Sequence, residues 1–166
     1  MEEKFLHAEE AGEERSSRYQ TRKDLSSLSR AVSFASFDLS KLAGKSTFGR
    51  SEKLKSRKLI EQLFKEGKSV SKNGFTLVYL ATPLQVMYPA QAGFSVPKRN
   101  FKHAVDRNRM KRLMREAYRA NKLDLYAKLK EAEKQLAMMW VYKGRALATY
   151  EQTLEAVQFC LHKLKP

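Results

Sequence analysis

The sequence predicts an α+β fold, a two-layer α-β sandwich whose elements follow the order α-β-β-β-α-β-α along the chain. Two apolar runs, 75–81 (FTLVYLA) and 136–142 (LAMMWVY), are rich in aromatic, β-branched and other large apolar residues, which indicates buried strands. Three further stretches repeat apolar residues at helical spacing, and the longest of them also carries a dense run of basic side chains.

The first 46 residues are not expected to join this domain. They contain eight basic and eight acidic side chains, many serines and no sustained apolar period. Such a segment cannot bury enough apolar surface to offset the entropy lost on ordering. We therefore predict a disordered N-terminal extension over residues 1–46 and a folded domain over residues 47–166.

The first half of the domain is predicted to contain one helix and three strands. Four apolar residues over 59–64 follow helical spacing, and Gly67 is placed to end that helix. The strand over 75–81 follows it. A second strand is expected within 85–90 and a third over 92–96, each limited by a proline, which cannot donate to a strand ladder.

The second half is predicted to contain a long helix, a strand and a final helix. The long helix spans about 104–121 and carries an apolar stripe formed by Met110, Leu113, Met114 and Ala117. The strand over 136–142 follows. The last helix begins at Thr149, because Thr149 and Gln152 have the spacing of a capping box. Its apolar face contains Leu154, Val157, Leu161 and Leu164.

The charge of the chain indicates a polyanionic partner. Lysine and arginine total 33 against 18 acidic residues, and the whole formal charge of +15 lies in residues 47–166. The longest apolar run, 136–142, is too short to cross a bilayer, so no membrane partner is expected. The single cysteine, Cys160, excludes an intramolecular disulfide, and no secretion signal is evident. These features favour a cytoplasmic protein.

Residues 98–119 concentrate this charge, with nine basic side chains and two acidic ones. On a helix, Arg107, Lys111, Arg115 and Arg119 are spaced by four and lie on one side, while the apolar stripe anchors the other side. A solvated helical face is the alternative interpretation. Like charges at this spacing destabilise a helix, however, so the arrangement favours binding to a phosphate backbone.

Three blocks of the sequence resemble the bacterial ribonuclease P protein family. Residues 107–116 (RNRMKRLMRE) resemble its RNR signature, and 93–99 (GFSVPKR) resemble the strand that leads into the basic helix. Residues 54–57 together with 63–69 resemble its first helix and the following turn. The blocks occur in the family's order, and the resemblance covers about residues 47–165.

The resemblance implies a left-handed β-α-β crossover, as in the ribosomal protein S5 domain 2-like fold. It also implies that the chain is the protein subunit of an endoribonuclease that removes the 5′ leader of precursor tRNA. In that family the RNA subunit performs the hydrolysis, and magnesium is required by the RNA-protein holoenzyme. We therefore expect the RNA subunit and precursor tRNA as partners. We expect no DNA partner, and neither a catalytic residue nor a bound metal or cofactor on the protein itself.

The resemblance also implies two sets of contact residues. Contacts to the RNA subunit are expected from Lys98, Arg99, Arg107, Asn108, Arg109, Lys111, Arg112 and Arg115. Contacts to the single-stranded leader are expected from Phe64, Phe75, Val78 and Tyr79. Aromatic rings suit this task because they stack on bases without reading the sequence. The alternative for Phe64 is packing in the core, and one turn before it Ile60 stands where relatives often have an aromatic residue.

Two other functions are compatible with a basic chain. A ribosomal or other structural RNA-binding protein often carries its excess charge in a tail, whereas residues 1–46 have no net charge. A helix-turn-helix DNA regulator needs a helix one short turn before its recognition helix. Here the preceding segment is strand-like and contains Pro97, which disfavours that function.

Overall fold

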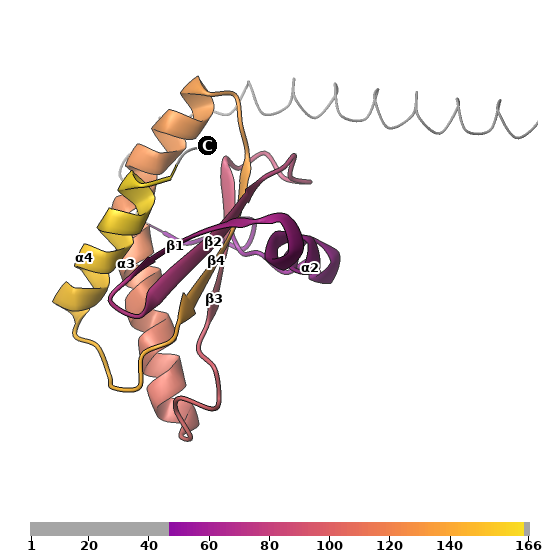
Figure 1. The fold of residues 1–166 in the computed structure, drawn as a ribbon. Helices are drawn as coiled ribbons and strands as arrows, with labels where there is room; N and C mark the ends of the chain where they lie inside the picture. The colour runs from indigo at the N-terminus through magenta and orange to yellow at the C-terminus, as the bar shows by residue number, and fades with distance from the viewer. Residues whose placement is uncertain (1–46, 165–166) are drawn as a thin grey trace, which may run out of the picture.

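The computed structural model describes residues 47–164, so the predicted disorder of the N-terminal extension lies outside the described residues. The described elements are α2 (Arg57–Glu66), β1 (Lys68–Lys72), β2 (Phe75–Ala81), β3 (Ala90–Ser95), α3 (Ala104–Glu131), β4 (Leu136–Tyr142) and α4 (Tyr150–His162) (Figure 1). The α+β class and the order α-β-β-β-α-β-α are confirmed.

The four strands form one open sheet in the order β1-β2-β4-β3. Strand β2 pairs antiparallel with both β1 and β4, whereas β3 pairs parallel with β4. Parallel neighbours end at the same edge of a sheet, and here Ser95 of β3 lies opposite Val141 of β4. The loops that follow β3 and β4 therefore leave the sheet side by side.

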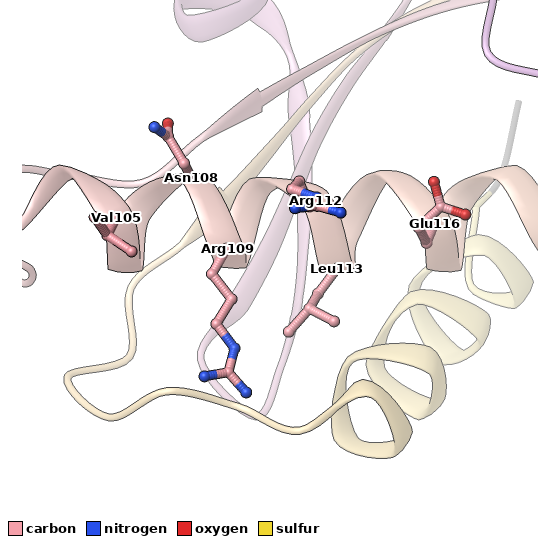
Figure 2. Close-up of a pocket in the computed structure, with 6 residues that line it drawn as sticks. All are labelled: Val105, Asn108, Arg109, Arg112, Leu113 and Glu116. Carbon is pink, nitrogen blue, oxygen red and sulfur yellow. The ribbon is translucent and has the colours of Figure 1, made fainter.

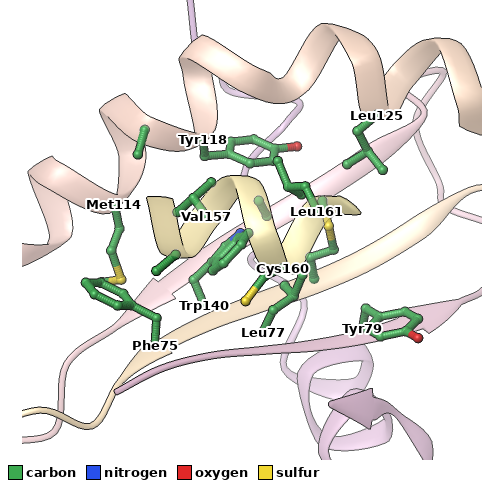
Figure 3. Close-up of a cluster of buried hydrophobic side chains, with 14 of the residues drawn as sticks. Phe75, Leu77, Tyr79, Met114, Tyr118, Leu125, Trp140, Val157, Cys160 and Leu161 are labelled. Atoms are coloured by element: carbon green, nitrogen blue, oxygen red, sulfur yellow. The ribbon is translucent and has the colours of Figure 1, made fainter. Parts of the chain in front are cut away.

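Helices α3 and α4 cover one face of the sheet, and α2 lies on the other face (Figure 1). The main core lies between the sheet and α3 and α4, where Leu77 and Trp140 are fully buried (Figure 3). A smaller core places Leu63 of α2 against Ala137 and Met139 of β4. The predicted two-layer arrangement thus describes the sheet with α3 and α4, and α2 adds a short cover on the opposite face.

The expected separate strand within 85–90 is wrong, because residues 85–89 form a connection and Ala90 already begins β3. The buried side chain of Gln135 holds this connection. Its Nε2 donates to the carbonyl oxygens of Val86 and Tyr88, each at 2.9 Å, and its Oε1 accepts from the backbone N–H of Leu84 at 2.7 Å. These bonds satisfy backbone groups that a strand ladder would otherwise use.

The strand missing from the prediction is β1, which forms a hairpin with β2. The two strands are joined by Asn73 and Gly74, with Lys72 opposite Phe75. Both turn residues have positive φ, 49° and 79°, which a two-residue hairpin turn of this type requires and which asparagine and glycine tolerate best.

The helix ends follow the predicted signals, except at the end of α3. Gly67 ends α2, and a Cβ at this position would lie 2.2 Å from the carbonyl oxygen of Leu63, so glycine is required there. Thr149 and Gln152 form the predicted capping box of α4. The predicted end of α3 at residue 121 is too early, because Leu125 and Leu129 extend its buried face to Glu131.

A buried ion pair fixes the chain segment that precedes α2. The Lys122 ammonium of α3 pairs with the Glu52 carboxylate, and both side chains are at most 2% exposed. The same ammonium donates to the carbonyl oxygen of Thr47, and the Tyr126 hydroxyl donates to Glu52 at 2.7 Å. Burial, reinforced by neighbouring groups including the Glu52 carboxylate, raises the pKa of the Tyr126 hydroxyl.

Backbone pairing completes this attachment. The backbone N–H of Leu54 donates to the carbonyl oxygen of Ala92 at 3.1 Å. The backbone N–H of Ala92 donates to the carbonyl oxygen of Glu52 at 2.8 Å. Residues 47–54, which we call the entry strap, are thereby fixed along the edge of β3 and against α3.

Candidate nucleic-acid interface

The N-terminal half of α3 presents most of the predicted RNA-binding side chains. Met110, Met114 and Ala117 are fully buried and attach the helix to the sheet. Around the remaining surface, Asn108, Arg109 and Arg112 are exposed, while Arg107, Lys111 and Arg115 are half-buried. The predicted cationic side, which also includes Arg119, is therefore half-buried, and the exposed cations Arg109 and Arg112 lie beside it.

Part of this charge is already engaged within the protein. The Arg107 guanidinium donates to the carbonyl oxygens of Phe101 and Lys102, each at 2.8 Å, and so holds the loop between β3 and α3. Arg115 lies over the ring of Phe94, 6.0 Å from its centroid. Arg119 pairs with Glu116 at 2.8 Å.

Three cations of α3 differ in this respect. Among residues 47–164, no carboxylate forms an ion pair with Arg109, Lys111 or Arg112. Unpaired like charges on one helix repel one another, and an anion that approaches this surface relieves that repulsion. These three side chains are the part of α3 best suited to bind phosphate.

An open groove of about 580 Å³ lies beside these cations, and we call it the α3 groove. It is lined by Val105, Asn108, Arg109, Arg112, Leu113 and Glu116 (Figure 2). Figure 2 shows Arg109 and Leu113 projecting from one side of the helix and Asn108 from the other. Val105 is 76% exposed and adds an accessible apolar surface to the groove.

A second cationic hollow of about 600 Å³ lies where the loops after β3 and β4 meet. It is lined by Arg99, Asn100, Lys143 and Arg145, and we call it the loop hollow. The Asn100 amide donates to the carbonyl oxygens of Lys143 and Gly144, at 2.7 and 3.2 Å, and ties the two loops together. Lys98 is exposed in the same loop as Arg99.

Sequence reasoning missed Lys143 and Arg145 as candidate site residues. Both follow directly after the predicted strand over 136–142, and basic residues after a strand are a weak signal by themselves. Their significance depends on the parallel pairing of β3 with β4, which brings them next to Arg99.

The four predicted leader-binding residues lie on two faces of the sheet. Phe64 of α2 is 55% exposed, and Val78 is half-buried on the same face of the sheet as α2. Phe75 and Tyr79 lie on the opposite face, in the main core, and are 1% and 7% exposed. Their burial corrects the prediction that they contact the leader, because a stacked base needs an accessible ring face.

The described part of the chain contains neither a metal-binding cluster nor a membrane-spanning helix. Within residues 47–164, no three His, Cys, Asp or Glu side chains gather closely enough to hold a metal ion. None of the helices in that range combines the length and apolar character needed to cross a bilayer.

Comparison with known proteins identifies similar chains. The family model for ribonuclease P matches residues 48–165. A ribonuclease P protein component from Chlorobium phaeobacteroides is 34% identical over 124 residues, which cover 69% of this chain and 85% of that protein. The ribonuclease P protein component from Porphyromonas gingivalis is 36% identical over 121 residues, which cover 71% of this chain and 88% of that protein.

Solved structures show the same fold. The RNase P protein from Staphylococcus aureus matches with a TM-score of 0.56 at 20% identity, over 68% of this chain and 94% of that one. The RNase P protein from Thermotoga maritima matches with a TM-score of 0.56 at 21% identity, over 69% of this chain and 99% of that one.

Proposed function

Because the chain belongs to the ribonuclease P protein family, we propose that it is the protein subunit of a ribonuclease P holoenzyme, which removes the 5′ leader from precursor tRNA. The observation that carries this proposal is a set of three cations on α3, Arg109, Lys111 and Arg112, that have no carboxylate partner within residues 47–164. They form a rigid phosphate-binding surface on a helix whose other side is buried. Precursor tRNA is made in the cytoplasm, so we place the protein there.

The RNA subunit binds this surface of α3 through its phosphates. Arg109, Lys111 and Arg112 supply charge, and the amide of Asn108 can both donate to and accept from RNA. The loop hollow extends the cationic surface beyond the start of α3, with Arg99, Lys143 and Arg145 around one concave space. An RNA backbone that runs along α3 and into the loop hollow meets phosphate-binding side chains at both places.

The leader of the precursor tRNA binds on the α2 side of the sheet. The exposed ring of Phe64 offers a stacking surface, and Val78 adds an apolar contact on the same face. Stacking accepts any base, which suits leaders of varied sequence. The RNA subunit with bound magnesium performs the hydrolysis, and the protein contributes binding and orientation.

The function can be tested by reconstitution. Purified protein alone is expected to leave precursor tRNA intact, and the protein mixed with its RNA subunit is expected to cleave off the leader at low magnesium concentration. The readout is the length of the 5′ product. Cleavage by nuclease-treated protein without the RNA subunit would contradict the assignment of chemistry to RNA.

Replacing Phe64 with alanine is expected to weaken binding of leader-bearing precursor to the holoenzyme by about 1–3 kcal/mol, because one base loses its stacking partner. Binding of mature tRNA, which has no leader, is expected to stay the same. Since Phe64 is 55% exposed, its truncation is expected to change the free energy of unfolding little. The matched control is Phe159→Ala, which removes a 38% exposed ring on α4. An equal loss for precursor and mature tRNA would exclude a leader contact.

A further inference from the structure

The α3 groove is lined by both cationic and apolar side chains, and phosphate binding uses only the cationic ones. Arg109 and Arg112 supply the charge that a phosphate backbone requires. Beside them along the helix, Leu113 and the largely exposed Val105 supply apolar surface, which a phosphate does not use (Figure 2). A ligand that matches both parts carries apolar side chains next to negative charges.

Residues 1–14 of the same chain have this chemistry. Although residues 1–46 have no net charge, residues 1–14 contain six glutamates and one lysine, and residues 15–46 carry the opposite excess of basic side chains. Phe5 and Leu6 stand between the pairs Glu2-Glu3 and Glu9-Glu10. The segment is therefore an apolar pair flanked by carboxylates.

The entry strap shows where this segment joins the domain. The carbonyl oxygen of Thr47 accepts a hydrogen bond from the Lys122 ammonium. The rings of Phe48 and Phe94 pack edge to face, with their centroids 5.6 Å apart. Phe94 lies directly under Arg115, so the chain enters the domain beside the cationic half of α3.

The length of the intervening chain is sufficient. Lys122 and Arg109 are separated by about 20 Å along α3 at the helical rise per residue. The residues between Leu6 and Thr47 would span about 60 Å even if all of them were helical, and more if extended. The acidic segment can therefore reach the α3 groove of its own molecule.

We propose that residues 1–14 occupy the α3 groove of their own molecule when RNA is absent. Phe5 and Leu6 pack against Val105 and Leu113, and the flanking glutamates neutralise Arg109 and Arg112. The segment thereby competes with RNA for the same arginines. This inference rests on the proposed function, because it assigns a competitor to the RNA-binding surface.

Competition of this kind favours the correct RNA. Because residues 7–46 tether the segment to its own domain, its effective concentration near the groove is on the order of millimolar, which suffices for a weakly binding segment. An RNA that contacts α3 alone must displace the segment with few compensating contacts. The RNA subunit also reaches the loop hollow, which the segment leaves open, and so displaces it more readily.

Two full-length variants test the inference. One replaces Glu2, Glu3, Glu9, Glu10, Glu13 and Glu14 with glutamine, and the other, F5A/L6A, keeps every charge. Both are expected to bind a short single-stranded RNA of unrelated sequence about three- to tenfold more tightly than the unchanged protein. The methyl NMR signals of Val105 and Leu113 are expected to shift in both variants.

Groove residues provide the matched test from the other side. Val105→Ser is expected to tighten binding of the unrelated RNA as F5A/L6A does, and its 76% exposure leaves the core untouched. Combining Val105→Ser with F5A/L6A is expected to add little further, because both changes remove the same contact.

The outcomes separate the inference from the proposed function. If all variants bind RNA like the unchanged protein and the two methyl signals stay in place, the inference is wrong. The proposed function then still stands if Arg109→Ala with Arg112→Ala weakens binding of the RNA subunit, and it fails if that change has no effect. Tighter binding by the glutamine variant alone would overturn the groove contact, because diffuse charge would then explain the effect.

Discussion

Replacing Lys122 with methionine is expected to lower the free energy of unfolding by about 3–5 kcal/mol. The substitution leaves the Glu52 carboxylate, which is 2% exposed, without its counter-charge. It also removes the donor to the carbonyl oxygen of Thr47, so the entry strap loses two attachments. Urea denaturation followed by circular dichroism measures the change.

Two controls identify the cause of that loss. Lys128→Met removes an exposed lysine from the same helix and is expected to change stability by less than about 0.5 kcal/mol. Adding Glu52→Gln to Lys122→Met is expected to recover part of the loss. The neutral amide is cheaper to bury than a lone charge and can still accept from the Tyr126 hydroxyl. A double variant as unstable as Lys122→Met would argue against an uncompensated charge as the cause.

Replacing Arg109 and Arg112 together with alanine is expected to weaken binding of the RNA subunit by about 3 kcal/mol, or more than about 100-fold. Both side chains are exposed and have no carboxylate partner among residues 47–164, so their charge is available for phosphates. The logarithm of the binding constant falls linearly with the logarithm of the salt concentration. Each lost phosphate contact is expected to make this slope shallower by roughly 0.7–0.9. Filter binding over a range of salt concentrations measures both quantities.

The matched control removes the same charge from the other end of the helix. Lys128 and Lys130 lie in the last turn of α3, and their joint replacement with alanine is expected to weaken binding only slightly. If this control weakens binding as much as the arginine pair, net charge and not position governs the interaction. Arg107 is a poor choice for this test, because its guanidinium also holds the loop before α3.

Local sequence signals predicted most of the elements correctly. The capping box at Thr149 and the glycine at position 67 mark helix ends through contacts within a few residues, so the sequence alone reveals them. The strands β2 and β4 were evident from their apolar runs. The hairpin turn at Asn73 and Gly74 is an equally local signal, and its omission led to the wrong second strand.

The connection over residues 82–89 could not be predicted in this way. Its backbone groups bond to Gln135, about fifty positions further along the chain, and no local pattern encodes such a contact. The burial of Lys122 in the extended part of α3 likewise depends on distant partners, because its ammonium pairs with Glu52 and donates to the carbonyl oxygen of Thr47.

By itself, the sequence determined the fold class, the cationic helix and the family, because helical spacing, charge density and ordered motifs are all local patterns. The tertiary structure alone decided which of these side chains are available to a ligand. Alternation placed Phe75 and Tyr79 on one strand face, but only packing against α3 and α4 buried that face. Parallel pairing of β3 with β4 brought Lys143 and Arg145 to Arg99. Both results depend on contacts between residues far apart in the chain, and such contacts form only when the whole domain folds.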